Sequence, residues 1–176
     1  MAATKTKSKS KPSAKQVATA YFDAVKKRDL DAMVACWKPG STDHLYGMAD
    51  LRVPDGLKRW FGAMFRAFPD FEMTVADMVA YGDKAAVRWH ATGTFTGPGK
   101  FEGLTPTGAA IELEGLDLLT IEDGKIVDNR AFTNATEMAR QLGAMPPAES
   151  LGEKAMLGAV NARTAAVGAI KRLRER

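Results

Sequence analysis

Apolar residues in the first third of the chain recur at the three- and four-residue spacing of amphipathic helices. The spacing predicts three helices, over residues 14–27, from Asp29 to Trp37, and from about residue 56 to Phe68. A capping box, Ser13-x-x-Gln16, marks the start of the first helix. The polar segment between the second and third helices, residues 41–53, is predicted to be a loop.

From Phe71 the spacing changes to alternation, which is the period of a half-buried strand. Four strands are expected, and they are bounded by turn signals such as Gly82-Asp83 and Asp123-Gly124. A short helix follows and ends at Gly143, a residue type that often terminates helices. The expected strands and the short helix cover residues 71–80, 85–95, 110–121, 125–133 and 135–142.

Helices followed by hairpin-connected strands predict an α+β fold with a curved antiparallel sheet packed on the N-terminal helices. The strand over residues 85–95 alternates an apolar set that includes Trp89 with a polar set that includes His90. If the apolar set faces the helices, His90 faces outward, although a bulge at Gly93 could reverse this. The aromatic side chains of the helices either fill the core or leave a cone-shaped cavity for a ligand.

Three domain segments are expected: a disordered basic tail (1–12), a cone domain (13–145) and an appended Ala-rich helix with a basic end (146–176). Alanines recur at alternating four- and three-residue spacing in the last segment, so this helix can pack closely on the body or on a second subunit. We therefore expect a homo-oligomer, a dimer or a tetramer.

The net charge of +4 is unevenly distributed along the chain. Residues 1–15 carry five lysines and no acidic residue, and the body between the two tails is mildly acidic. A specific nucleic-acid partner is not expected, because such domains carry their positive charge on a folded face. No apolar run is long enough to span a membrane. With the single cysteine, Cys36, and no secretory signal, the chain is expected to be cytoplasmic.

Three stretches in this order resemble the SnoaL-like polyketide (ester) cyclase family of the nuclear transport factor 2-like superfamily, over about residues 14–143. They are Phe68-Pro69-Asp70-Phe71, then Thr92 to Gly97 with Gly103 to Gly108, and finally Asp123 to Val127 running on to Gln141-Leu142-Gly143. The resemblance implies a cone-shaped pocket and cofactor-free acid/base chemistry on a polyketide ester, often in an oligomer.

The chain departs from the family pattern at three positions. Phe95 stands where the family usually has a histidine, and Arg130 replaces a frequent tryptophan. Asn134 stands where the family has its acid/base aspartate. An amide does not titrate near neutral pH, so Asn134 could only orient a carbonyl or an enolate by hydrogen bonding.

Candidate catalytic residues are therefore Asp117, His44 and Asn134. Asp117 lies among apolar residues, so it is either a desolvated base or a structural partner of Arg88 or Arg130. His44 is either a ligand contact at the pocket mouth or a surface residue. Expected ligand-binding residues are Trp37, Tyr46, Trp60, Phe61, Phe65, Trp89, Phe95, Arg130 and Phe132. No metal-ligand spacing or phosphate-binding loop occurs, and no cofactor is expected.

Three functions remain open from the sequence. The first is a cofactor-independent cyclase, isomerase or hydrolase acting on a hydrophobic carbonyl compound. The second is a binding protein that holds a hydrophobic small molecule without chemistry. The third is a structural role in assembly, which is compatible with either of the others.

Overall fold

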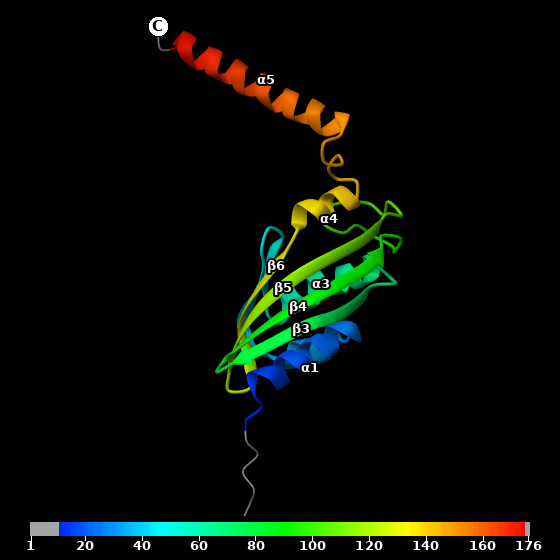
Figure 1. The fold of residues 1–176 in the computed structure, drawn as a ribbon, viewed down its shortest axis with the longest axis vertical. Helices are drawn as coiled ribbons and strands as arrows, with labels where there is room; N and C mark the ends of the chain where they lie inside the picture. The colour runs from blue at the N-terminus through cyan, green and yellow to red at the C-terminus, as the bar shows by residue number, and fades with distance from the viewer. Residues whose placement is uncertain (1–10, 175–176) are drawn as a thin grey trace, which may run out of the picture.

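The computed structural model describes residues 11–174, and it places six strands in one curved sheet (Figure 1). The predicted disordered tail lies outside the described residues, apart from Lys11, which pairs with Asp123, and Pro12. The helices are α1 (Ala14–Lys26), α2 (Leu30–Ala35), α3 (Asp55–Ala67), α4 (Ala135–Gln141) and α5 (Leu151–Arg174). The strands are β1 (Trp37–Leu45), β2 (Ala49–Arg52), β3 (Glu72–Tyr81), β4 (Lys84–Thr94), β5 (Ala110–Glu122) and β6 (Lys125–Thr133).

The N-terminal helices begin where their caps predict. Ser13 and Gln16 form the reciprocal capping box of α1, and Asp29 accepts a hydrogen bond from the backbone of Ala32 at the start of α2. The apolar face of α1 is buried, with Tyr21 and Phe22 at 2% and 4% exposure. This helix packs on β3, β4 and β5, so it covers one face of the sheet.

The predicted loop over residues 41–53 is wrong, because this segment contributes to two strands. β1 pairs in parallel with β6, and β2 pairs antiparallel with β1, which gives the strand order β2-β1-β6-β5-β4-β3. The sheet is therefore mixed, with one parallel pair in an otherwise antiparallel arrangement. The second helix also ends at Ala35, so Trp37 begins a strand.

Alternation along the central strands separates an inner face, which packs against the helices, from an outer face. On β4, Val87 and Ala91 are buried, whereas the His90 side chain is on the outer face beside Glu112. The predicted orientation of His90 is confirmed, and no bulge reverses it in the pairing of β4 with β5. The inner face and the helices thus enclose the core of the cone.

The appended C-terminal helix is present and projects away from the sheet (Figure 1). Arg140 of α4 donates to Glu153 in the first turn of α5 at 2.6 Å, and both side chains are about four-fifths buried. This ion pair ties the base of α5 to the end of α4. Apolar residues further along α5, such as Val160 and Val167, are more than half exposed.

Candidate functional site

A narrow cavity lies between the inner face of the sheet and helices α1 and α3. Its volume is about 80 Å³, and its walls are almost wholly apolar. Six aromatic side chains and four methionines line it: Tyr21, Phe22, Trp60, Phe61, Phe71, Trp89, Met48, Met64, Met73 and Met138. Two carboxyl groups, those of Asp43 and Asp117, also line the cavity.

The two carboxyl groups are joined by one amide. Asn129 donates from Nδ2 to Asp43 Oδ1 at 2.9 Å and to Asp117 Oδ2 at 2.7 Å. Tyr21 Oη donates to Asp43 Oδ2 at 3.3 Å, and Trp89 Nε1 donates to Asp117 Oδ1 at 2.8 Å. Asp43 and Asn129 are fully buried and Asp117 is 5% exposed, so the network is shielded from solvent.

Strand order brings these side chains together. β6 lies between β1 and β5, and Asn129 of β6 is in register with Asp43 of β1. On the other side, Asp117 of β5 is opposite Ala131, two residues beyond Asn129 on the same face of β6. One amide on the middle strand can therefore reach a carboxyl group on each neighbouring strand.

Burial dominates the electrostatics of the network. It raises the pKa of Asp43 to about 8, and the charge of Asp117 adds to this shift while the donors Asn129 and Tyr21 oppose it. Burial also raises the pKa of Asp117, against the stabilising donors Trp89 and Asn129. The phenol of Tyr21 has a pKa well above its usual value, again mainly through burial. Both oxygens of Asp117 accept N–H groups, at 2.8 and 2.7 Å, which is the pattern of a carboxylate. Within the described residues, one oxygen of Asp43 has only a hydroxyl partner, at 3.3 Å, so the hydrogen bonds assign the proton of the pair to Asp43 and the negative charge to Asp117.

Four of the residues expected from the sequence line this cavity: Asp117, Trp60, Phe61 and Trp89. Neither Arg88 nor Arg130 pairs with Asp117, because Arg88 bonds to Asp77 and Arg130 to Asp128. The predicted pairing of Asp117 with one of these arginines is therefore wrong.

Three further expected ligand contacts pack in the protein without lining the cavity. Trp37 is buried edge-on against Tyr21, with ring centroids 5.8 Å apart. Phe95 is fully buried and stacks on Phe68 at 5.2 Å. Phe65 contacts Phe61 and Phe71, which themselves line the cavity. These aromatic side chains support the wall from behind.

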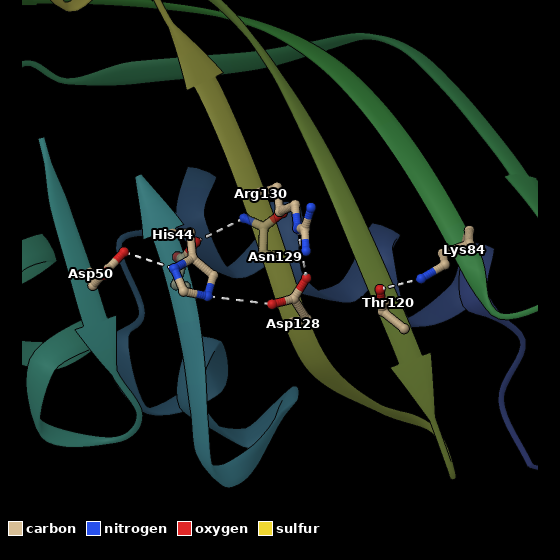
Figure 2. Close-up of polar contacts among 8 residues, drawn as sticks. His44, Asp50, Lys84, Thr120, Asp128, Asn129 and Arg130 are labelled. Carbon is tan, nitrogen blue, oxygen red and sulfur yellow. Dashed lines mark hydrogen bonds and ion pairs between the residues drawn. The ribbon is translucent and has the colours of Figure 1, made fainter. Parts of the chain in front are cut away.

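The remaining predicted site residues lie on the outer face of the sheet or at its end. Tyr46 and Phe132 stack on each other at 4.5 Å and are nearly half exposed. His44 lies between Asp50 at 2.7 Å and Asp128 at 3.5 Å, and Arg130 lies beside Asp128 (Figure 2). The structure thus separates His44 from Asp117.

Asn134 has a local structural role. Its side chain accepts a hydrogen bond from the backbone of Glu137 at 3.0 Å, which caps α4. It does not line the cavity. The position of the family's acid/base aspartate is therefore occupied here by a helix cap.

Sequence reasoning missed Tyr21, Asp43 and Asn129 as site residues. Treating residues 41–53 as a loop concealed that Asp43 and His44 point to opposite faces of a strand. The alternation from Asn129 through Ala131 to Thr133 on β6 was the available signal for Asn129. The opposite directions of Asp43 and His44 and the alternation on β6 point to a shared site only when β1 is recognised as a neighbour of β6.

Neither a metal cluster nor a membrane span is found in the part of the chain that the structure describes. Among residues 11–174 no three His, Cys, Asp or Glu side chains gather closely enough to hold a metal ion. Within the same residues, no helix combines the length and the apolar character needed to cross a bilayer.

Solved structures with the same fold come from several bacteria. The hydroxylase candidate AclR from Streptomyces galilaeus is 25% identical, with a TM-score of 0.66, and the match covers 90% of this chain and 96% of AclR. The polyketide cyclase candidate IdmH from Streptomyces antibioticus is 29% identical, with a TM-score of 0.59, covering 74% of this chain and 98% of IdmH. A SnoaL-like polyketide cyclase candidate from Jannaschia sp. CCS1 is 22% identical, with a TM-score of 0.65, covering 81% and 100%.

A search of curated proteins gives no match to this sequence. The family model for SnoaL-like polyketide cyclases, in contrast, matches residues 15–142, which span the helices and strands from α1 to α4. This range contains the cavity and its buried carboxyl pair. The chain therefore belongs to the SnoaL-like polyketide cyclase family.

Proposed function

We propose that this protein is a cofactor-independent, cyclase-like enzyme that transfers a proton on a hydrophobic carbonyl compound. The observation that supports this most directly is the pair of buried carboxyl groups in an otherwise apolar cavity. Carboxyl groups whose environments separate their pKa values are suited to opposite roles in proton transfer. Asp117 and Asp43 have such environments.

Asp117 is the proposed general base. It accepts two hydrogen bonds at 2.8 and 2.7 Å, which stabilise its charged form in the cavity. From the cavity wall it can remove a proton from a carbon next to a carbonyl group. Removal of that proton leaves an enolate, whose carbon can attack a second carbonyl of the same molecule and close a ring. The attack turns the second carbonyl oxygen into an alkoxide, which takes back the proton held by Asp117 and restores the base.

Asp43 is the proposed acid. Its pKa of about 8 keeps it protonated at neutral pH, so it can donate a hydrogen bond to the carbonyl oxygen on which negative charge develops. Tyr21 and Asn129 hold this carboxyl group in place. Catalysis by this pair needs no redox step, since a proton is moved and no electron pair leaves the substrate.

Family membership supports a carbonyl substrate. It does not by itself identify the reaction, because relatives with the same fold are candidates for different reactions. At 25% and 29% identity, one relative is a candidate hydroxylase and the other a candidate polyketide cyclase. The same fold therefore occurs in candidates for different reactions, and the reaction has to be inferred from the residues that line the cavity.

The size of the cavity constrains how a substrate enters. At about 80 Å³ it is smaller than the roughly 150 Å³ of an apolar cavity that holds benzene. Four of its lining residues are methionines, whose unbranched side chains change shape readily. We expect a polycyclic substrate to bind by displacing these methionine side chains.

The proposal is tested with a panel of polyketide esters and other enolisable ketones, assayed by mass spectrometry and by exchange of the substrate's acidic C–H in deuterium oxide. Asp117→Asn should lower turnover at least about 100-fold, the usual contribution of a positioned base. Asp43→Asn should also lower turnover. Asp77→Asn, which removes an exposed carboxylate that pairs with Arg88, is the matched control and should leave turnover unchanged.

Binding without turnover is the second candidate, favoured by Asn134 at the position of the family's acid/base aspartate. Tight binding of a hydrophobic carbonyl compound with no C–H exchange in the unaltered protein would support it. The same result would count against proton transfer by Asp117.

A further inference from the structure

The polar end of the cavity has acceptors to offer and few donors. Apart from the proton assigned to Asp43, each side-chain donor of the lining residues is engaged: Trp89 with Asp117, Tyr21 with Asp43, and Trp60 with Glu102 at 2.9 Å. The Thr133 hydroxyl donates to the backbone oxygen of Glu114 at 2.9 Å. The Asp117 carboxylate accepts two hydrogen bonds and retains unused lone pairs, since an ionised carboxylate can accept about four.

Asn129 bonds to both carboxyl groups and is not itself part of the cavity wall. Both of its recorded hydrogen bonds use Nδ2, and within residues 11–174 its buried Oδ1 atom has no hydrogen-bond partner. Buried polar atoms without partners are uncommon in folded proteins. The acceptor that the cavity itself offers is thus the Asp117 carboxylate, which suits a ligand group that donates hydrogen bonds.

No cationic side chain lines the cavity in the described part of the chain. On the outer face of the sheet, Arg130 pairs with Asp128, and His44 lies between Asp50 and Asp128 (Figure 2). The buried negative charge of Asp117 is therefore stabilised by hydrogen bonds from Trp89 and Asn129, and among residues 11–174 no cationic side chain of the cavity lining offsets it. A buried charge without an opposite charge is unfavourable, and a cationic ligand would relieve it.

The walls favour the same kind of ligand. Six aromatic side chains line the same cavity as the carboxyl pair, and the faces of aromatic rings attract organic cations. Aromatic walls combined with a buried carboxylate are a common way of recognising substituted ammonium groups in water. An anionic group would meet the charge of Asp117 and would find no compensating cation.

From these contacts we infer that the cavity selects its ligand by charge and takes an organic ammonium group in preference to a neutral or anionic group of the same shape. The inference rests on the same two carboxyl groups as the proposed function and adds the charge of the ligand. A carboxylic acid substrate would then bind only as its ester or amide. A substrate or inhibitor bearing a protonated amine would bind most tightly.

The test uses three probes that share a tert-butyl body: tert-butylammonium, tert-butanol and pivalate. Their affinities for the full chain are measured at pH 7 by calorimetry, with the shift in melting temperature as a second readout. We expect tert-butylammonium to bind at least about tenfold more tightly than tert-butanol, as a charge-assisted hydrogen bond predicts. Pivalate should not bind detectably.

Asp117→Asn is the diagnostic variant, and it should abolish the preference for tert-butylammonium. Asp128→Asn removes the same charge from the outer face and should keep the preference. Circular dichroism establishes that both variants are folded, and the series on the unaltered protein tests the inference even if Asp117→Asn does not fold. Equal affinity for pivalate and tert-butylammonium, or a preference that survives Asp117→Asn, would overturn the inference.

The results also separate this inference from the proposed function. Loss of turnover in Asp117→Asn without any binding of tert-butylammonium would refute charge selection and leave proton transfer standing. Charge-selective binding together with normal turnover in Asp117→Asn would support the cation site and refute Asp117 as the base.

Discussion

Burial of the Asp43 carboxyl group makes the stability of the fold depend on pH. The pKa of this group is about 8 in the folded protein, compared with 3.8 for an exposed aspartate. Between these two values the folded state binds more protons than the unfolded state, so the free energy of unfolding falls as the pH rises. A site that holds two carboxyl groups out of water thus lowers stability at neutral pH, as functional sites often do.

The first prediction is that Asp43→Asn flattens this pH dependence. In the unaltered protein Asp43 should contribute a loss of up to about 1.4 kcal/mol per pH unit between roughly pH 4 and pH 8. The variant should lack that slope and gain stability near pH 8. Urea unfolding at a series of pH values measures both effects.

Asp70 provides the control of opposite sign. Its exposed carboxylate accepts hydrogen bonds from Thr94, which lower its pKa. Asp70→Asn should therefore lose stability at neutral pH, and the loss should fade in acid. If Asp43→Asn kept the slope of the unaltered protein, the assignment of the proton to Asp43 would be wrong.

The second prediction concerns Asn134 as a helix cap. Asn134→Ala should lower the free energy of unfolding by about 1 kcal/mol, because the hydrogen bond to Glu137 is lost. Asn134→Asp should retain the stability, since aspartate caps helices equally well. Thermal unfolding provides the comparison. A gain of turnover in Asn134→Asp would instead indicate that this position still reaches the substrate.

At the scale of elements, Gly115 on β5 controls where the Trp89 indole lies. A Cβ atom at residue 115 would come within 2.1 Å of the indole ring, so only glycine leaves room for the ring opposite it on β4. That ring carries the N–H group that bonds to Asp117. The orientation of the proposed base therefore depends on a missing side chain on its own strand.

The third prediction is that Gly115→Ala lowers turnover by displacing Trp89. We expect intrinsic tryptophan fluorescence to shift and the pH profile of turnover to move upward, because the pKa of Asp117 rises when a donor is lost. Gly158→Ala in α5 is the control, since no atom lies near its Cβ position. An unaltered fluorescence spectrum and pH profile in Gly115→Ala would contradict the proposed role of this contact.

Strand alternation could be predicted from the sequence, and it placed Trp89 on the inner face and His90 on the outer face. Asp117 was identified because apolar residues flank it on a strand. β1 could not be predicted, because Lys38-Pro39-Gly40 and the polar residues after it break the apolar pattern. Its parallel partner is far away, with Asp43 and Asn129 separated by 86 positions. The local sequence pattern therefore identified Asp117 as a site residue but not Asp43.

At the scale of the whole molecule, α5 presents an apolar face that the body does not cover. Leu157, Val160, Val167 and Ile170 are 52–59% exposed, and the helix projects from the cone (Figure 1). An isolated helix is only marginally stable in water, since most helical stability comes from packing. We expect a second copy of the chain to cover this face.

The fourth prediction is that α5 sets the oligomeric state. Deleting residues 149–176 should lower the mass measured by analytical ultracentrifugation, and the double change Val160→Lys with Val167→Lys should do the same. Ala165→Lys is the matched control, because residue 165 lies about 140° around the helix from Val160 and about 160° from Val167. An unchanged mass in the deletion variant would exclude α5 from assembly.

The parallel pairing of β1 with β6 has a consequence for how the protein is made. Asp43 leaves the ribosome early, but the strand that links it to Asp117 is almost the last part of the cone to be synthesised. A nascent chain that stops before Lys125 would hold β1 and β5 without the strand between them, and contacts this distant in sequence form slowly. The chemistry of the cavity should therefore begin only when synthesis of the cone is nearly complete, which protects the growing chain from binding ligand in a half-formed site.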